Sequence, residues 1–252
     1  MKGRRRANGT PAAVVGRRPA LEAVRSGAAV EILVAVGARR TAGLRELLEA
    51  ARAAGVTVRE TSADEVAALA GGARDQGVAA RIRSPRPLTE ADLARRAWSE
   101  DAVVVALDGV TDPRNVGAVA RTAEAAGAEA LVLRRHRGAT ITPAAARASA
   151  GTLLLLPVAE VANVARALGR LKSAGFWVVG LDQEAGTPID EARRPAGPLV
   201  LVLGSEGEGM SRLVRGACDE LLAIPMPGSV ASLNVAVAAG VALFGYARRQ
   251  ER

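Results

Sequence analysis

The chain contains few of the residues that form covalent cross-links, metal sites or aromatic binding platforms. Its 252 residues include one cysteine, Cys218, and one histidine, His136. A single cysteine excludes an internal disulfide framework, and two such residues are too few for a Cys/His zinc site, so no metal is expected. The two Trp, one Tyr and two Phe are too few to stack several bases of a nucleic acid. Any recognition of nucleic acid would have to depend on phosphates and shape.

Long apolar runs are missing as well. No stretch of 18 or more apolar residues occurs, so no transmembrane helix is expected. The basic segment 1–19 also lacks the continuous apolar stretch of a secretory signal. Together these absences predict a cytoplasmic protein that does not insert into a membrane.

The net charge of +8 is confined to the first part of the chain. Residues 1–97 hold 18 Lys+Arg and 10 Asp+Glu, whereas residues 98–252 hold 16 of each. Compositional bias explains why Arg exceeds Lys, but it does not explain this location. A basic segment beside a neutral domain is typical of a nucleic-acid binder, although a solvated tail is an alternative.

Two α/β domains are expected. Residues 1–11 are predicted to be a disordered basic arm, 12–83 a small α/β domain, 84–99 a linker, and 100–252 a second α/β domain. In the small domain, we expect helices at 20–25, 44–54 and 62–69, and strands at 31–36, 56–59 and 78–82. Ser62, followed three residues later by Glu65, predicts that the third helix is capped at its start.

The second domain has the pattern of a parallel sheet. Apolar strands are expected at 102–107, 130–133, 176–181, 198–203 and 221–224, with helices that include 116–126 and 161–174. Continuous Val/Leu strands separated by helices indicate a sheet that is covered on both faces. The last helix, 232–246, is apolar nearly all round, which predicts either a core position or a subunit interface.

Three segments of this domain carry polar and glycine residues at strand ends, where ligands bind in open α/β sheets. In 107–128, Asn115 is a plausible helix N-cap, and Arg121 lies in an otherwise small and apolar helix. By itself this segment is equally compatible with an ordinary capped helix whose arginine faces solvent or pairs with Glu124. In 224–240, a Pro/Gly turn leads to Ser232, for which plain helix capping is an alternative.

The segment 201–211 has three glycines after a strand, Gly204, Gly207 and Gly209, with Glu206 between them. The order G-x-x-G-x-G differs from the dinucleotide-binding fingerprint, and the lysine of a P-loop is missing. An oxidoreductase that binds a nicotinamide dinucleotide is therefore disfavoured. The pattern alone allows either a ligand loop or a bare turn.

Taken together and in this order, the three segments strongly resemble the three motifs of the SpoU/TrmH family of RNA 2'-O-ribose methyltransferases. The matching stretches are DGVTDPRNVGAVARTAEAAG, GSEGEGM with its preceding strand, and IPMPGSVASLNVAVAAG. The N-terminal stretches GRRPALEAV (16–24) and DQGVAAR (75–81) resemble the substrate-binding domain of the branch that methylates a guanosine of 23S ribosomal RNA. That branch usually has His where this chain has Asp75.

The resemblance implies a knotted parallel-sheet methyltransferase domain preceded by a small α/β substrate-binding domain, with S-adenosyl-L-methionine as cofactor. It also implies a homodimer and an RNA substrate. Matched residue by residue, the catalytic positions are Arg121, Asn115, Glu206, Ser232 and Asn234. The cofactor positions are Leu203, Gly204, Gly207, Ile224, Pro225, Met226, Ser232 and Leu233.

The chemistry agrees with these assignments. A sulfonium methyl is already electrophilic, so alignment of a ribose hydroxyl with it is the main task, and positioning supplies roughly 7–11 kcal/mol. Because a guanidinium stays protonated, we expect Arg121 to bind an RNA phosphate rather than to act as a base. The alternatives are the same chemistry on transfer RNA or on another ribosomal site, and a non-catalytic RNA-binding protein of the same fold. The extra N-terminal domain favours ribosomal RNA through the resemblance alone.

Overall fold

The computed structural model describes residues 12–72, 74–83, 87–135, 152–154, 156–230 and 232–247. The chain divides into two compact units, 1–86 and 87–252, and each is described by itself. The predicted basic arm, 1–11, lies outside the described residues. None of the helices in the described ranges is long and apolar enough to cross a bilayer.

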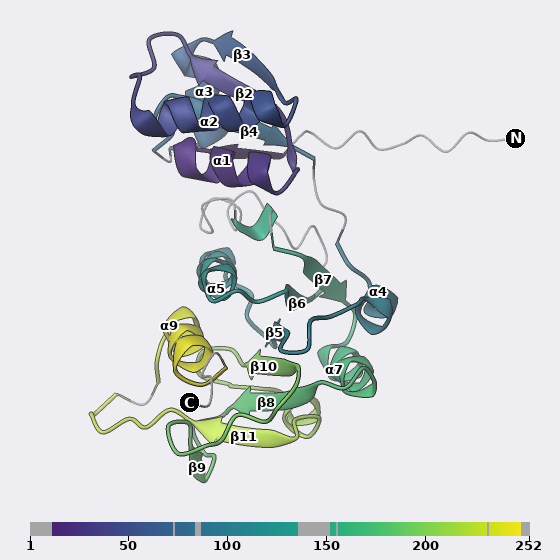
Figure 1. Cartoon of the computed structure of the whole chain (residues 1–252). Helices are drawn as coiled ribbons and strands as arrows, with labels where there is room; N and C mark the ends of the chain where they lie inside the picture. The colour runs from purple at the N-terminus through teal and green to yellow at the C-terminus, as the bar shows by residue number, and fades with distance from the viewer. Residues whose placement is uncertain are drawn as a thin grey trace, which may run out of the picture. The chain divides into compact units, whose positions relative to one another are not determined.

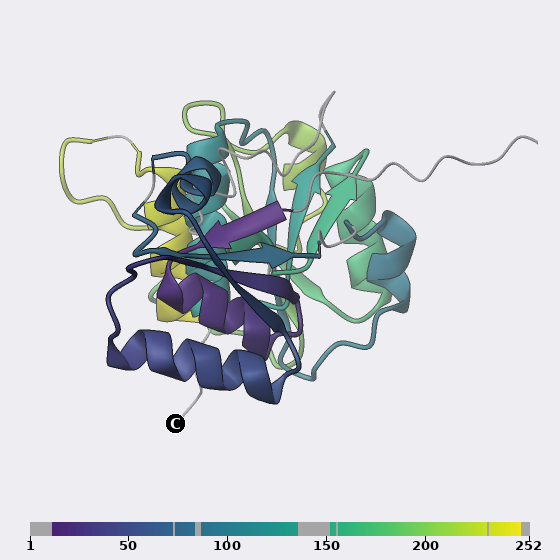
Figure 2. The ribbon, with the colours of Figure 1, turned by 90° about the horizontal axis from the view of Figure 1, so that it is seen from above.

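Unit 1 is a four-stranded sheet with helices on both faces. The strands are β1 (Ala12–Val15), β2 (Ala29–Ala35), β3 (Thr57–Thr61) and β4 (Val78–Ile82), in the order β1-β4-β2-β3. β4 runs antiparallel to both β1 and β2, whereas β3 is parallel to β2. Figure 2 shows the strands between α3 (Ala63–Ala70) and the pair α1 (Arg17–Arg25) and α2 (Ala42–Ala53).

Strand periodicity explains this two-sided cover. Side chains alternate between the two faces of a strand, so Leu33 and Ala35 of β2 pack beneath α3 with Val66 and Ala79. Ile32 and Val34, which alternate with these residues along β2, are buried as well. The predicted helices and the strand at 78–82 agree with the structure to within a few residues, whereas β1 was not predicted.

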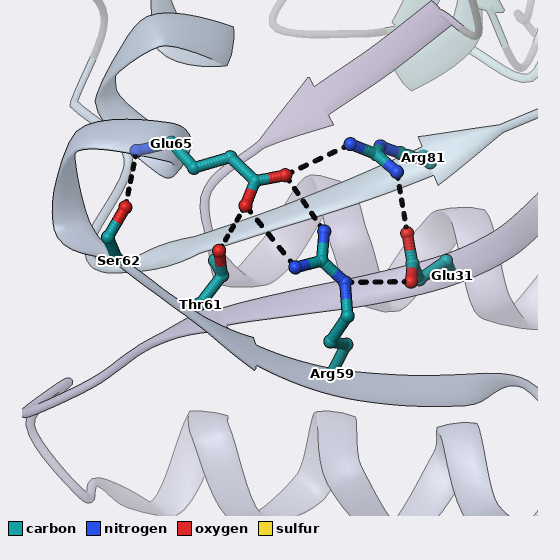
Figure 3. A network of polar contacts seen from close by, with 6 residues as sticks. All are labelled: Glu31, Arg59, Thr61, Ser62, Glu65 and Arg81. Atoms are coloured by element: carbon teal, nitrogen blue, oxygen red, sulfur yellow. Dashed lines mark hydrogen bonds and ion pairs between the residues drawn. The ribbon is translucent and has the colours of Figure 1, made fainter.

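The start of α3 has the predicted cap. The Ser62 hydroxyl does accept the Glu65 N–H, at 3.2 Å. The Glu65 carboxylate, however, faces Arg59, Thr61 and Arg81 rather than the backbone of Ser62 (Figure 3). Charged partners on neighbouring strands attract the carboxylate more strongly than a neutral amide does, so the cap is confirmed without the reciprocal bond from Glu65.

Unit 2 is a seven-stranded parallel sheet (Figure 1). The strands are β5 (Val103–Leu107), β6 (Ala130–Arg134), β7 (Val158–Val161), β8 (Trp177–Leu181), β9 (Thr187–Pro188), β10 (Leu199–Leu203) and β11 (Glu220–Ala223). Their order is β7-β6-β5-β10-β8-β11-β9, so β10, late in the chain, lies between β5 and β8. Whether the chain threads into the expected knot stays a prediction.

Helices cover both faces of this sheet. α5 (Pro113–Ala125), α9 (Val235–Ala242) and the π-helical turn η2 (Leu243–Ala247) lie on one face, where Val103, Val105 and Leu107 point. The other face carries α4 (Glu90–Arg95), α7 (Val164–Ser173) and α8 (Arg212–Arg215), against Val104 and Ala106. The short 3-10 helix η1 (Thr152–Leu154) contacts α5.

The predicted linker, 84–99, is not an extended connection throughout. It contains α4, which begins with a capping box formed by Thr89 and Asp92. Leu93 of this helix is fully buried in the core of unit 2, and Leu88 forms a parallel bridge with Ala159. The two prolines and several charges favoured a linker, but the capped helix and the buried Leu93 make part of this segment belong to unit 2.

Candidate active site

A cavity of about 440 Å³ opens at the carboxyl ends of β8, β10 and β11. It lies where ligands bind in open parallel sheets, and Leu203, Ile224 and Leu233 form apolar parts of its wall. The complete lining is Leu181, Asp182, Gln183, Glu184, Leu203, Gly204, Ser205, Glu206, Gly207, Glu208, Gly209, Met210, Arg215, Ile224, Met226, Ser232, Leu233, Val235 and Ala238.

The glycine-rich loop after β10 is a tight hairpin. The backbone N–H of Ser205 donates to Gly209 O at 3.1 Å, and that of Gly209 donates to Ser205 O at 3.0 Å. A Cβ on Gly204 would lie 2.1 Å from the carbonyl carbon of Gly209 and 2.3 Å from the nitrogen of Met210. Gly204 is therefore the residue that lets the loop fold back on itself and expose backbone groups to the cavity.

The buried carboxylate of Asp108 binds the backbone at the end of the glycine-rich loop. Asp108, directly after β5, is only 6% exposed, and its Oδ2 accepts the Ser211 N–H at 2.7 Å. The Asp108 N–H donates to Leu203 O at 2.9 Å. The motif that contains Asp108 was predicted to be functional, but this residue was not singled out, because one aspartate in a turn is no distinctive signal.

Side chains from the three predicted segments meet beside the cavity. Glu206 Oε1 accepts a hydrogen bond from Asn115 Nδ2 at 3.1 Å and from Asn234 Nδ2 at 2.7 Å. Asn234 Nδ2 also donates to Asn115 Oδ1 at 2.9 Å, and the Val235 N–H reaches Glu206 Oε1 at 3.4 Å. Residues that are distant in the sequence thus form one polar cluster.

Helix starts hold both asparagines. Asn234 caps α9, with its Oδ1 accepting the Ala236 N–H at 2.9 Å, so the capping alternative for Ser232 is wrong. The predicted N-cap role of Asn115 is also wrong: Asp112 caps α5 by accepting the Arg114 N–H at 2.8 Å. Pro113 at the first helical position fixes the helix start before Asn115, which leaves the Asn115 amide free to reach Glu206.

Of the other predicted site residues, Leu203, Gly204, Gly207, Ile224, Met226, Ser232 and Leu233 line the cavity. Pro225 and Arg121 are not among the lining residues. Arg121 is exposed on α5, and the predicted alternative pair with Glu124 is not among the ion pairs of the described residues. It lies six residues beyond Asn115, about 9 Å along the helix axis.

Acidic residues that the sequence did not indicate lie on the β8 side of the cavity. Asp182 Oδ2 lies 2.6 Å from Arg215 Nε, and Asp182 Oδ1 accepts the Glu184 N–H at 2.9 Å. Arg215 NH2 also lies 3.9 Å from a Glu184 carboxylate oxygen. Asp182 and Glu184 follow the end of β8, and Arg215 is the last residue of α8. Only the sheet order, which places β8 beside β10, brings these residues to the glycine loop.

The cavity fits S-adenosyl-L-methionine by the chemistry of its donors and acceptors. Its apolar wall suits an adenine and a methionine chain, and the hairpin after β10 offers backbone polar groups. The carboxylates of Asp182, Glu184 and Glu206 suit the hydroxyl and cationic groups of such a molecule. A volume of about 440 Å³ lies within the usual range for small-ligand pockets, roughly 300–1,000 Å³.

Comparisons with known proteins agree with this arrangement. Residues 102–244 match the model of the SpoU rRNA Methylase family, and residues 13–88 match the model for RNA 2'-O ribose methyltransferase substrate binding. The chain is 41% identical over 209 residues to the 23S rRNA (guanosine-2'-O-)-methyltransferase RlmB of Photobacterium profundum. The matched region covers 82% of this chain and 85% of that protein.

Two further matches extend the comparison. A protein of Mycolicibacterium vanbaalenii, described as an uncharacterized tRNA/rRNA methyltransferase, is 40% identical over 240 residues, 94% of this chain and 76% of that protein. Among solved structures, the SpoU methyltransferase AviRb of Streptomyces viridochromogenes, in complex with AdoMet, superposes with a TM-score of 0.73 at 28% identity. That match covers 94% of this chain and 89% of AviRb.

Proposed function

The chain belongs to the SpoU rRNA methylase family, and from that premise we propose that it methylates a guanosine ribose of 23S ribosomal RNA. It is an enzyme that transfers a methyl group from S-adenosyl-L-methionine to a ribose 2'-hydroxyl of RNA. The observation that carries the proposal is the cluster of Asn115, Glu206 and Asn234 beside the cavity. Several relatives named RlmB support the choice of substrate.

We assign the cofactor to the cavity at the glycine loop. Leu203, Ile224 and Leu233 would hold its apolar parts, and the backbone of the hairpin after Gly204 would bind its polar groups. When bound, the cofactor supplies an electrophilic sulfonium methyl. The protein's own contribution is to exclude water from the apolar wall and to fix the direction from which a hydroxyl approaches.

The polar cluster orients the ribose. Glu206 Oε1 accepts from three N–H groups in the structure, and these hydrogen bonds hold both asparagine amides in fixed positions. Ser232, on the cavity wall, would bind the ribose that carries the reacting hydroxyl, and Asn234 Oδ1, which accepts one N–H in the structure, would accept a second hydrogen bond from that ribose. Arg121, exposed on α5, would bind an adjacent RNA phosphate, and an oxygen of that phosphate would accept the hydroxyl proton.

We also propose that the enzyme acts as a homodimer. Val237, Val241 and Phe244 are 53%, 41% and 58% exposed, and their spacing places them along one side of α9 and η2. The helix is flanked by α5, since the position of a Cβ on Gly240 lies 3.7 Å from Thr122, the neighbour of Arg121. A second copy that covers this apolar side would therefore also bring Arg121 close to the subunit interface.

A protein that acts on ribosomal RNA works where ribosomes are assembled, so we further propose a cytoplasmic location. The central test is mass-spectrometric mapping of ribose methylation. We expect purified enzyme with labelled S-adenosyl-L-methionine to produce one 2'-O-methylguanosine in 23S ribosomal RNA from a strain that lacks the gene. Methylation of transfer RNA instead would overturn the proposal that 23S ribosomal RNA is the substrate. Absence of S-adenosyl-L-methionine binding in calorimetry would overturn the assignment of the cavity.

A further inference from the structure

Unit 1 contains a second cavity, and its wall is basic. The cavity measures about 330 Å³ and is lined by Arg17, Ala38, Arg39, Thr41, Arg74, Gln76 and Gly77. Three of these seven residues are arginines, and none is acidic. The arginines come from the start of α1, the loop before α2 and the loop before β4, so three separate segments of unit 1 direct positive charge to one place.

Arg17 forms the fixed part of this cavity. Its guanidinium donates to Thr41 Oγ1, to Arg39 O at 2.9 Å and to Gln76 O at 3.3 Å. Its backbone N–H donates to Gln76 Oε1 at 3.2 Å. Arg17 therefore ties the two loops together, while its Nε is buried and has no hydrogen-bond partner among the described residues.

The loop that carries Gln76 is held in an unusual conformation. Gln76 has φ +56°, a left-handed value, and Gly77 follows with φ +75°. Asp75 stabilises this turn, because its Oδ1 accepts the Gly77 N–H at 2.6 Å and its backbone oxygen accepts the Val78 N–H at 3.0 Å. The nearby carboxylate is thus engaged by its own turn, and it does not line the cavity.

The other two arginines are free to bind a ligand. Arg39 and Arg74 are exposed, and within the described part of unit 1 neither forms one of the ion pairs that engage Arg25, Arg59 and Arg81. Two helices also begin here, α1 at Arg17 and α2 after its cap Thr41. Their positive ends add to the field of the arginines.

We propose that this cavity, which we call the arginine pocket, binds a phosphodiester of the RNA substrate. This inference rests on the proposed function and deepens it by naming the group that unit 1 grips. Guanidinium groups match phosphate oxygens in geometry and charge, and phosphate contacts fix the register of a protein on RNA without reading its sequence. With so few aromatic residues in the chain, phosphate binding is also the mode of recognition that the composition allows.

The test compares two double variants of the full-length enzyme. Arg39→Ala with Arg74→Ala removes two charges from the arginine pocket, whereas Arg52→Ala with Arg83→Ala removes two exposed charges elsewhere in unit 1. Arg17 is left intact, because it supports the loops. RNA affinity is measured by filter binding to a 23S ribosomal RNA fragment at several salt concentrations, and S-adenosyl-L-methionine affinity by calorimetry.

We expect the pocket variant to bind RNA at least tenfold more weakly at low salt. The slope of log affinity against log salt should become shallower by about one unit per lost contact. Its KM for RNA should rise while kcat at saturating RNA and cofactor affinity stay within twofold of wild type. Equal losses of RNA affinity in the two double variants would overturn the inference about the arginine pocket. The proposed function is judged separately, by methylation of RNA by the wild-type enzyme. The inference would also be overturned if the pocket bound inorganic phosphate but the pocket variant bound RNA as tightly as wild type does.

Discussion

Asn234 Nδ2 lies 2.7 Å from Glu206 Oε1, and this hydrogen bond joins the cap of α9 to the glycine loop after β10. The same carboxylate oxygen accepts from Asn115 at 3.1 Å. Hydrogen bonds to a charged acceptor each contribute about 1.5–3 kcal/mol, so the carboxylate is the group on which the cluster depends. Both amides lose their common partner when it is removed.

Glu206→Ala should therefore disorganise the ribose site without unfolding the protein, because Glu206 is exposed. We expect methyl transfer to fall at least a hundredfold and the melting temperature to change by only a few degrees. Single-turnover methylation and calorimetric melting measure the two effects. Glu100→Ala, which removes an exposed carboxylate away from the cavity, is the control. Near-normal turnover in Glu206→Ala would show that Glu206 has no role in methyl transfer.

Gly204→Ala tests the shape of the hairpin. The added Cβ would lie 2.1 Å from the backbone of Gly209, so the loop has to open, and overpacking of this kind costs about 1–3 kcal/mol or more. We expect S-adenosyl-L-methionine affinity, measured by calorimetry, to fall at least tenfold. Gly186→Ala, where a Cβ meets no atom within 4 Å, should bind the cofactor as wild type does. Equal affinities in the two variants would contradict this account of the loop.

The ion-pair network of unit 1 predicts a pH dependence of stability. Hydrogen bonds from Arg59, followed by that from Thr61, lower the pKa of Glu65 to about 2 from its ordinary 4.5. Because the folded-state pKa is the lower one, the stabilisation is complete above about pH 5 and is lost as the pH falls toward 2. The protection factors of amides in β2 and β4, which are hydrogen-exchange rates corrected for the intrinsic pH dependence of exchange, should therefore fall across this range.

Glu65→Gln is the matched variant for this prediction. It should flatten the acid-dependent part of the exchange profile in unit 1, whereas Glu49→Gln, an exposed change on α2, should leave the profile as in wild type. If Glu65→Gln and wild type lose protection in parallel between pH 5 and 2, the network does not couple folding to pH.

The apolar side of α9 and η2 predicts the oligomeric state. The double variant Val237→Asp with Phe244→Asp introduces two charges at positions whose side chains are 53% and 58% exposed. The fold of the monomer should therefore tolerate both substitutions. A homodimer interface should not, since a buried unpaired charge is costly. Light scattering should report a dimer for wild type and a monomer for the variant. A wild-type monomer at micromolar concentration would refute the proposed homodimer.

Local signals in the sequence were sufficient for most elements of the fold. Apolar runs located β5, β6, β8, β10 and β11, because central parallel strands are buried on both faces. The two-residue β9 and the edge strands β1 and β7 were missed because short strands at a sheet margin carry little periodic signal. The helix in the predicted linker was missed for a related reason: six residues contain only one buried side chain, Leu93.

The site shows where sequence patterns lose information. The motif match found Asn115, Glu206 and Asn234, and the structure brings these three together. It did not find Asp182 or Arg215, whose approach to the cavity depends on the insertion of β10 between β5 and β8. The local residue pattern misplaced the cap of α5, since Asp112 and Asn115 are both good capping residues and only the position of Pro113 distinguishes them.

Arg121 can have one of two roles, a surface ion pair or a contact with an RNA phosphate. It is exposed on α5, it does not line the cavity, and helical geometry turns it about 120° away from Asn115, six residues earlier. A purely structural arginine in such a position contributes at most about 0.5 kcal/mol through a surface ion pair. A role in binding the phosphate beside the reacting ribose makes a different prediction.

Under that role, Arg121→Ala should keep the wild-type melting temperature and cofactor affinity while methyl transfer falls by orders of magnitude. Arg121→Lys should restore little, because a compact ammonium does not reproduce the planar pair of donors that grips a phosphate. Arg114→Ala, a neighbouring exposed arginine on α5, controls for loss of charge. Single-turnover rates at saturating RNA separate chemistry from binding. Near-full turnover in the Lys variant would exclude a two-pronged phosphate contact, and near-full turnover in the Ala variant would make Arg121 a surface residue.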